Sequence, residues 1–285
     1  MKLGITVSTY PTNFGPIIFK DGNLRENIRE MAALGYHGVD LFTNEKTPQE
    51  LQDLRILFKD GGIEINTYLA IFLAEKGVKL SEINDVKRLH DIDLYRKEIN
   101  NAQKIGAKSI ALGYIRGEIG EGDSYLACEE RLAHSLEIVG KHAAERGIVI
   151  GLEPINRYEL NFINSVMEAV AFMKKFRPVG VGLLLDAFHM NIEDLDFSES
   201  IHAAAGIISN FHAPGSSRLA TGSGHLDYDA IISALNETGY TGYLTLEAFP
   251  KPDSFTVAKQ SAEFLKGKFF THNIRIGDQE VVNEG

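Results

Sequence analysis

The sequence contains very little cysteine and no long hydrophobic run. Its 285 residues include one cysteine, Cys128, so no disulfide can form within the chain. Because Cys128 falls in a predicted helix, we interpret it as a packing residue. No segment approaches the ~20 apolar residues that cross a membrane, and the first ten residues, MKLGITVSTY, have too short an apolar run for a signal peptide. These absences predict a cytoplasmic protein that does not insert into a membrane.

The sequence also lacks an excess of positive charge. It has 39 acidic and 29 basic residues, which gives a formal net charge of −10 at pH 7. This balance disfavours nucleic acids and anionic membrane surfaces as partners. The 44% hydrophobic content is ordinary for a globular protein. The length is close to the ~250 residues typical of one (β/α)₈ barrel.

Short apolar segments alternate with helical patterns along the chain. The predicted strands are Lys2–Ser8, Gly38–Phe42, Ile63–Leu69, Ser109–Ile115, Val149–Glu153, Val179–Asp186, Ile207–His212 and Gly242–Glu247. The predicted helices begin near Asn23, Thr47, Asp85, Asp123, Ser165, Ser198, Asp229 and Ser254. This alternation predicts an α/β protein with a single (β/α)₈ TIM barrel over residues 1–266. Residues 267–285 read as a polar C-terminal tail outside the repeat.

An open doubly wound sheet would show the same alternation of strands and helices. Such a sheet normally carries a glycine-rich phosphate loop after its first strand. Here the first strand leads into Thr9-Tyr10-Pro11-Thr12-Asn13, which has no such fingerprint. The sequence therefore favours the closed barrel.

Four predicted strands end in a polar side chain. These side chains are Glu153, Asp186, His212 and Glu247, and they are 26 to 35 positions apart. In a barrel the carboxyl ends of the strands converge on one site, and a buried carboxylate is costly unless a cation or proton shares it. Three carboxylates and one imidazole suit Mn²⁺ or Mg²⁺ and also admit Co²⁺. The pattern predicts a metal site without a thiolate, unlike most structural zinc sites.

Three further candidates follow these strand ends. Glu159 lies six residues after Glu153, His189 lies three after Asp186, and Arg218 lies six after His212. Two of them also have a structural interpretation: Glu159 could pair with Arg157, and Arg218 could form a surface salt bridge. His225 is left open between the two interpretations. The histidines at positions 37, 90, 134, 142 and 202 fall away from strand ends and are interpreted as structural.

Longer motifs around these residues resemble a known family. They are Glu153-Pro154-x-Asn156-Arg157-x-Glu159, then Asp186-x-Phe188-His189-Met190-Asn191-Ile192-Glu193, then His212 with Arg218, then Glu247. With them the chain resembles the ketose 3-epimerases, the tagatose/psicose group of the xylose-isomerase-like TIM barrels. The resemblance covers nearly the whole chain and is strongest from Glu153 to Glu247.

The resemblance implies a function for each candidate. It implies that Glu153, Asp186, His212 and Glu247 hold a divalent metal, with Mn²⁺ as the first choice. It implies that Glu153 and Glu247 act as acid and base on C3 of a ketose, through an enediolate that the metal stabilises. Glu159, His189 and Arg218 would bind the O1/O2 end of the sugar. Relatives are commonly dimers or tetramers, so a homo-oligomer is expected.

The loop after His212 departs from the family pattern, so the sugar preference is not carried over. Many relatives have Gly-Glu-x-Asn-Arg and then Pro-Gly there, whereas this chain has Ala213-Pro214-Gly215-Ser216-Ser217-Arg218 and then Thr221-Gly222. The piece Gly222-Ser223-Gly224-His225-Leu226-Asp227 resembles relatives that act on inositol or keto-sugar acids. Arg116, Arg157 and Lys251 lie near predicted strand ends and are candidates for binding a substrate phosphate.

Three alternative functions remain at this stage. An aldose–ketose isomerase of the hydride-shift type usually needs a second metal and a lysine, and no lysine stands among the strand-end residues. A phosphodiesterase resembling apurinic endonucleases would need histidines where the third and fourth strands end in Tyr68-Leu69 and Tyr114-Ile115. A non-catalytic sugar-binding protein would not need the intact pair of Glu153 and Glu247.

Overall fold

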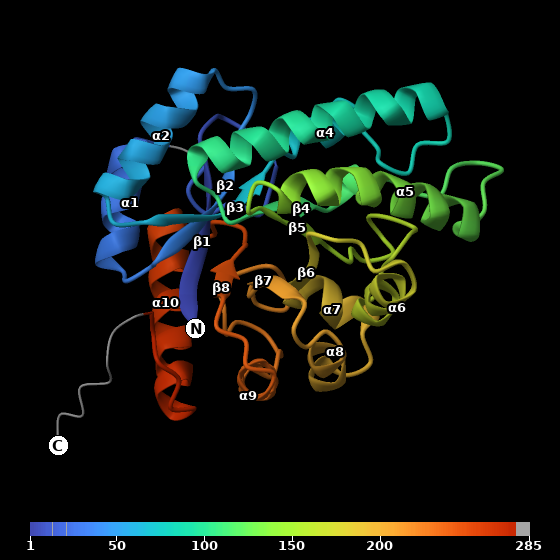
Figure 1. The fold of residues 1–285 in the computed structure, drawn as a ribbon. Helices are drawn as coiled ribbons and strands as arrows, with labels where there is room; N and C mark the ends of the chain where they lie inside the picture. The colour runs from blue at the N-terminus through green and yellow to red at the C-terminus, as the bar shows by residue number, and fades with distance from the viewer. Residues whose placement is uncertain (13, 21, 278–285) are drawn as a thin grey trace.

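The computed structural model describes residues 1–12, 14–20 and 22–277 of the chain. Eight parallel strands form a closed barrel in sequence order, with the helices packed around it (Figure 1). The strands are β1 (Lys2–Ser8), β2 (Gly38–Phe42), β3 (Glu64–Leu69), β4 (Ser109–Leu112), β5 (Val149–Leu152), β6 (Val181–Asp186), β7 (Ile208–His212) and β8 (Tyr243–Leu246). Pairing of β1 with β8 closes the barrel, with Lys2 opposite Tyr243 and Ile5 opposite Leu246. The predicted (β/α)₈ barrel is confirmed.

The helices that cover the barrel begin within two residues of their predicted starts. The covering helices are α1 (Leu24–Ala33), α2 (Pro48–Asp60), α4 (Asp85–Ile105), α5 (Tyr125–Ala144), α6 (Val166–Phe176), α8 (Phe197–Ala203), α9 (Tyr228–Glu237) and α10 (Ser254–Thr271). Thr47 and Ser165 each form a capping box, with Glu50 and Glu168 three residues later. These reciprocal bonds satisfy backbone donors that would otherwise lack partners at the helix start.

Within the described residues, three short helices were not predicted, and one of them follows a strand that ends in a site residue. They are α3 (Phe72–Glu75), the 3₁₀ helix η1 (Tyr114–Arg116) and α7 (Ala187–Glu193). The predicted fourth strand extends to Ile115, but β4 ends at Leu112 and the chain turns at Gly113. A side chain at Gly113 would meet Glu153, since its Cβ would lie 2.7 Å from Glu153 Oε2. Asp186 caps α7 by accepting a hydrogen bond from Phe188 N at 2.8 Å.

The last helix is longer than expected. It continues to Thr271, past the predicted end near Leu265, because Phe269 is a further buried residue on its inner face. The following turn packs against the start of the chain, where Gly277 N donates to Met1 O at 3.0 Å. The remainder of the predicted tail, residues 278–285, lies outside the described residues.

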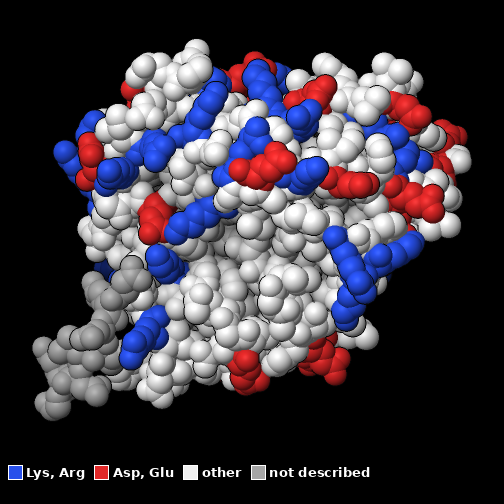
Figure 2. Space-filling view, viewed as in Figure 1, with Lys and Arg blue, Asp and Glu red and all other residues white. Residues whose placement is uncertain are grey.

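The core has two parts. A large apolar cluster lies between the strands and the helices that cover them. A smaller cluster of Ile17, Phe42, Leu69, Ala111 and Leu184 is separate from it and includes the last residues of β2 and β3. Charged side chains gather over α2, α4 and α5 in the upper part of the view in Figure 2, while the centre of that face has few. Within the described residues, no helix has both the length and the apolar composition to cross a membrane.

Candidate functional site

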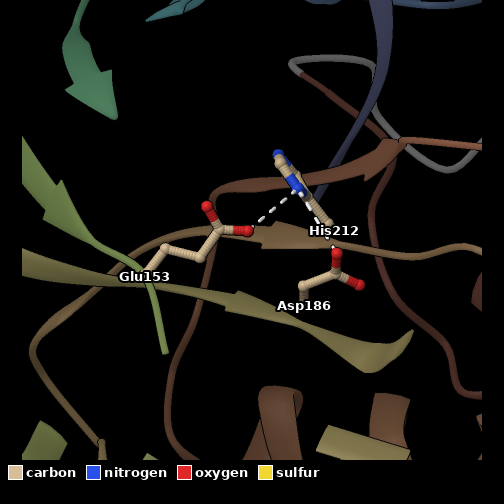
Figure 3. A group of neighbouring side chains, drawn as sticks. All are labelled: Glu153, Asp186 and His212. Carbon is tan, nitrogen blue, oxygen red and sulfur yellow. Dashed lines mark ion pairs between the residues drawn. The ribbon is translucent and has the colours of Figure 1, made fainter. Parts of the chain in front are cut away.

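The carboxyl ends of four neighbouring strands bring the predicted metal ligands together. Asp186 and His212 are the last residues of β6 and β7, and Glu153 and Glu247 directly follow β5 and β8. All four side chains are buried. One ligand atom from each of Glu153, Asp186 and His212 lies within 4.8 Å of the others. Figure 3 shows both carboxylates directed at the His212 ring.

The fourth predicted ligand, Glu247, lies beside the other three. Its Oε2 is 3.6 Å from Nδ1 of His212, while Glu153 Oε1 and Asp186 Oδ2 are each 3.9 Å from that nitrogen. This Nδ1 is buried and has no hydrogen-bond partner. A buried polar atom without a partner calls for an explanation such as a bound ion. An unpaired imidazole nitrogen facing three carboxylate oxygens fits a divalent cation well.

Arg218 places a cation inside this group of carboxylates. Its Nη2 donates to Glu247 Oε2 at 2.8 Å and to Asp186 Oδ2 at 3.2 Å, and its guanidinium stacks on the ring of Phe188 at 4.7 Å. The backbone adopts φ +57°, a conformation that costs a non-glycine residue ~1–2 kcal/mol. A 2.7 Å bond from Phe249 N to Arg218 O stabilises it. The alternative interpretation of Arg218 as a surface ion pair is wrong.

His189 and Glu159 lie next to the carboxylates and are linked through Asn156. Nε2 of His189 is 3.8 Å from Asp186 Oδ2. Asn156 Nδ2 lies 2.8 Å from His189 Nδ1 and also donates to Glu159 Oε1 at 2.8 Å. Glu159 accepts a second bond from the Tyr114 hydroxyl. Nδ1 of His189 faces the Asn156 amide, and Nε2 faces the guanidinium of Arg218 at 3.4 Å, so both ring nitrogens have donors beside them.

The local charges give the carboxyl groups different proton affinities. Burial raises the pKa of Glu153 and of Asp186. Burial acts in the same direction on Glu247, but the positive charges of His212 and Arg218 outweigh it and lower the pKa of Glu247. Burial and the nearby Arg218 lower the pKa of His189, which favours its neutral form. The site therefore combines an ionised carboxylate with a carboxyl group that holds a proton more readily.

Two contributors to the site were missed at the sequence level. Asp40, on β2, is fully buried, and its Oδ2 accepts a hydrogen bond from Nε2 of His212 at 2.9 Å. The sequence feature that could have indicated Asp40 is its place as an acidic residue in the centre of an otherwise apolar strand, Gly38–Phe42. Tyr114 is the second, since its hydroxyl donates to Glu159. The sequence places Tyr114 in the predicted strand Ser109–Ile115, whereas β4 ends at Leu112, two residues before Tyr114.

The three basic residues suggested for a substrate phosphate are engaged elsewhere. Arg116 is fully buried and donates to backbone carbonyl oxygens, among them Glu153 O at 2.7 Å and Phe162 O at 2.7 Å. Arg157 forms an exposed ion pair with Glu193 rather than with Glu159. Lys251 lies over the ring of Phe249 at 5.5 Å.

The pocket beside the carboxylates has a mixed lining. Its polar side chains are those of Tyr114, Glu153, His189, Arg218 and Glu247. Its apolar side chains include Phe14, Phe42, Leu69, Ile71, Ile115 and Ile155. His225, which the sequence left open, lies exposed beside Asn191 at 3.1 Å. The predicted metal ligands, His189 and Arg218 thus come from β5 to β8 and the segments that follow them, while Tyr114 follows β4 and Asp40 lies on β2.

Comparisons with known proteins agree with this geometry. The family described as xylose isomerase-like TIM barrel matches residues 28–268. The chain is 29% identical over 263 residues to D-psicose 3-epimerase of Agrobacterium fabrum, covering 88% of this chain and 86% of that protein. It is 23% identical over 232 residues to 3-dehydro-D-guloside 4-epimerase of Escherichia coli, covering 79% of this chain and 87% of that protein. A crystal structure of D-psicose 3-epimerase in the presence of D-fructose superimposes with a TM-score of 0.78 at 23% identity, covering 95% of this chain and 99% of that one. These matches confirm the resemblance that the motifs indicated.

Proposed function

The chain belongs to the xylose isomerase-like TIM barrel family, and we propose that it is a metal-dependent epimerase that inverts C3 of a ketose. One observation carries the proposal. Glu153 and Glu247 directly follow β5 and β8, two strands separated by β6 and β7, and both carboxylates lie near the unpaired Nδ1 of His212. Two carboxyl groups that approach one centre from different strands can exchange a proton on opposite faces of a substrate carbon.

The four predicted ligands would hold the cation, and Mn²⁺ is our first choice for this oxygen-rich set. When bound, a divalent ion supplies Lewis-acid stabilisation of negative charge on the substrate oxygens. Glu247, whose pKa is lowered, is suited to remove the proton at C3. Glu153, whose pKa is raised, is suited to deliver a proton to the other face. Groups of this kind each contribute ~10²–10⁴-fold to the rate.

The remaining polar side chains would orient the O1/O2 end of the sugar. His189 turns its Nε2 toward the site, and Arg218 presents a cation next to both Asp186 and Glu247. Glu159 is held by Asn156 and Tyr114, so it offers an acceptor in a fixed position. The preorganised cation of Arg218 stabilises negative charge that develops on the substrate oxygens without further rearrangement.

We further propose that the substrate is an uncharged ketose. Among the described residues that line the pocket, Arg218 is the only one that is a lysine or an arginine. Its guanidinium already pairs with Asp186 and Glu247. A phosphate or a sugar carboxylate would therefore enter the pocket without a cation of its own, which is costly. The homo-oligomer implied by the resemblance stays a prediction.

A second candidate is epimerisation at C4 of a 3-keto sugar. The relative named 3-dehydro-D-guloside 4-epimerase supports it, since that name places the reaction next to a C3 ketone. The same two carboxyl groups would exchange the proton at that carbon. The phosphodiesterase alternative is less favoured, because β3 and β4 end in the apolar Leu69 and Leu112 rather than in histidine.

The test is solvent-isotope exchange followed by proton NMR. The full chain is loaded with Mn²⁺ in D₂O and offered free ketoses, ketose phosphates and 3-keto sugars, and the metal is chelated before spectra are recorded. Deuterium at C3 together with a new epimer supports the proposal. Deuterium at C4 of a 3-keto sugar supports the second candidate, and an aldose product indicates an isomerase. No change in any substrate contradicts the proposal.

A further inference from the structure

Asp40 lies behind His212, on the side of the ring away from the other carboxylates. Its Oδ2 is 2.9 Å from Nε2 of His212. The other ring nitrogen, Nδ1, faces Glu153 and Glu247 and has no hydrogen bond. Asp40 belongs to β2 and His212 to β7, so the contact crosses the interior of the barrel rather than joining neighbouring strands.

The Asp40 carboxylate is itself held in place by amide donors. Its Oδ1 accepts from Asn66 Nδ2 at 3.0 Å, and its Oδ2 accepts from Asn210 Nδ2 at 2.5 Å. Both amides also donate to Thr67 Oγ1, at 3.2 and 3.1 Å. These four side chains are buried inside the barrel, where small displacements are resisted by close packing. The orientation of Asp40 toward His212 is therefore fixed by residues that do not touch the pocket.

We propose that Asp40 is a positioning residue that sets the tautomer of His212 and directs its Nδ1 lone pair at a divalent cation. A carboxylate can only accept, so Nε2 must carry the hydrogen in this contact. Nδ1 is then left unprotonated and free to bind a metal. Carboxylates behind ligating histidines fix ring orientation and increase ligand basicity, and their loss typically costs ~10–100-fold in metal affinity. This inference rests on the proposed function only in requiring that the site binds a divalent ion.

The same contacts would also exist if Asp40 served only to satisfy buried amides. A matched variant separates these interpretations. Thr67→Val removes an acceptor from the same buried network and nearly preserves shape, and the Thr67 hydroxyl accepts from Asn66, Ser109 and Asn210 rather than from His212. Asp40→Asn also nearly preserves the shape of the side chain. It replaces one carboxylate oxygen, an acceptor, with an amide donor, although the neighbours Asn66, Asn210 and His212 already donate to this side chain.

The first measurement is Mn²⁺ affinity, which is independent of turnover. The chelator-treated full chain is titrated with Mn²⁺, and free Mn²⁺ is followed by its electron paramagnetic resonance signal. We expect Asp40→Asn to bind ~10–100-fold more weakly than the natural sequence, and Thr67→Val to stay within about threefold of it. The inference would be overturned if Asp40→Asn is folded, as judged by circular dichroism, and its Mn²⁺ affinity is within threefold of that of the natural sequence.

A second measurement does not depend on whether Asp40→Asn folds. The natural sequence is labelled with ¹⁵N-histidine and loaded with diamagnetic Zn²⁺, which binds imidazole nitrogen well. Long-range ¹H–¹⁵N spectra, with the His212 signals assigned through their loss in His212→Gln, report which ring nitrogen is protonated. A proton on Nε2 and a metal-shifted Nδ1 are expected. A proton on Nδ1 would overturn the inference.

The two proposals fail in different ways. If the protein binds Mn²⁺ and inverts a ketose while Asp40→Asn retains full affinity, only the role of Asp40 is wrong. If affinity depends on Asp40 but no sugar is converted, the inference stands and the proposed function is wrong. If the natural sequence binds no divalent ion, both are wrong.

Discussion

The guanidinium of Arg218 donates to the carboxylate of Glu247 across 2.8 Å, in a buried contact that also includes Asp186. A permanent positive charge therefore lies among the groups that we assign to metal binding and proton transfer. It favours the ionised form of Glu247, and it would repel a divalent cation bound to the same carboxylates. We therefore expect Arg218 to affect catalysis and metal binding in opposite directions.

Replacing Arg218 with methionine separates these two effects. We expect kcat/KM to fall by ~10²–10³-fold, the usual cost of removing a donor that faces developing negative charge. We also expect Mn²⁺ to bind severalfold more tightly, because a like charge has been removed. Steady-state kinetics and Mn²⁺ titration test these expectations, with the exposed Arg157→Met as the matched control. Weaker Mn²⁺ binding by Arg218→Met would contradict this account.

The proposed acid and base can be tested one at a time. Glu153→Gln and Glu247→Gln keep the side-chain shape but can neither accept nor return the C3 proton. We expect the epimerisation rate of each variant to fall by ~10²–10⁴-fold, the usual contribution of a positioned acid–base group. Circular dichroism and metal analysis accompany the kinetics, since both residues are also predicted ligands. Turnover near that of the natural sequence, with metal bound, would disprove the two-carboxyl mechanism.

Arg116 is expected to stabilise the backbone that carries Glu153. Its guanidinium donates to the carbonyl oxygens of Gly113, Glu153, Phe162 and Ile163. Arg116→Met would take the side-chain donor away from the buried carbonyl oxygens of Glu153, Phe162 and Ile163, at ~1–3 kcal/mol for each group that water cannot reach, whereas Gly113 O keeps its bond from the backbone N of residue 116. We expect a loss of ~3–5 kcal/mol in the free energy of unfolding, measured in urea. The control Arg157→Met, at an exposed side chain, should change the free energy of unfolding by less than ~1 kcal/mol.

Glu64 predicts a pH dependence of stability at the amino-terminal end of the barrel. Partial burial opposes ionisation, but hydrogen bonds from Lys108 and Tyr243 prevail and lower the pKa of Glu64 to about 2. A carboxyl group with a lowered folded-state pKa stabilises the protein above its unfolded pKa of 4.5, and this stability is lost as the pH falls toward 2.

Glu64→Gln is the corresponding test. The side chain is 44% exposed, so solvent screening limits the expected destabilisation at pH 7 to ~0.2–1 kcal/mol. The difference between Glu64→Gln and the natural sequence should shrink between pH 4.5 and pH 2 in urea unfolding. A difference that stays constant across this range would show that the ionised form of Glu64 does not contribute.

The main features of the site could be predicted from the sequence because strand ends in a barrel are marked by composition. Apolar runs that stop at Glu153, Asp186, His212 and Glu247 locate buried polar groups, and parallel strands bring such ends to one edge. Capping boxes at Thr47 and Ser165 similarly marked helix starts, since those bonds are made by residues three apart. These signals depend only on local chemistry and repetition.

Other features depended on contacts between distant segments. Asp40 is 172 positions from His212, and no local pattern indicates that these two side chains meet inside the barrel. Arg116 resembled a strand-end cation in the sequence, but the chain turn at Gly113 directs it into the protein toward four carbonyl oxygens. The sequence alone therefore determined which residue types end each strand. Only the closed barrel decided which of them face one another, because partners across its interior are chosen by packing and hydrogen bonding rather than by spacing.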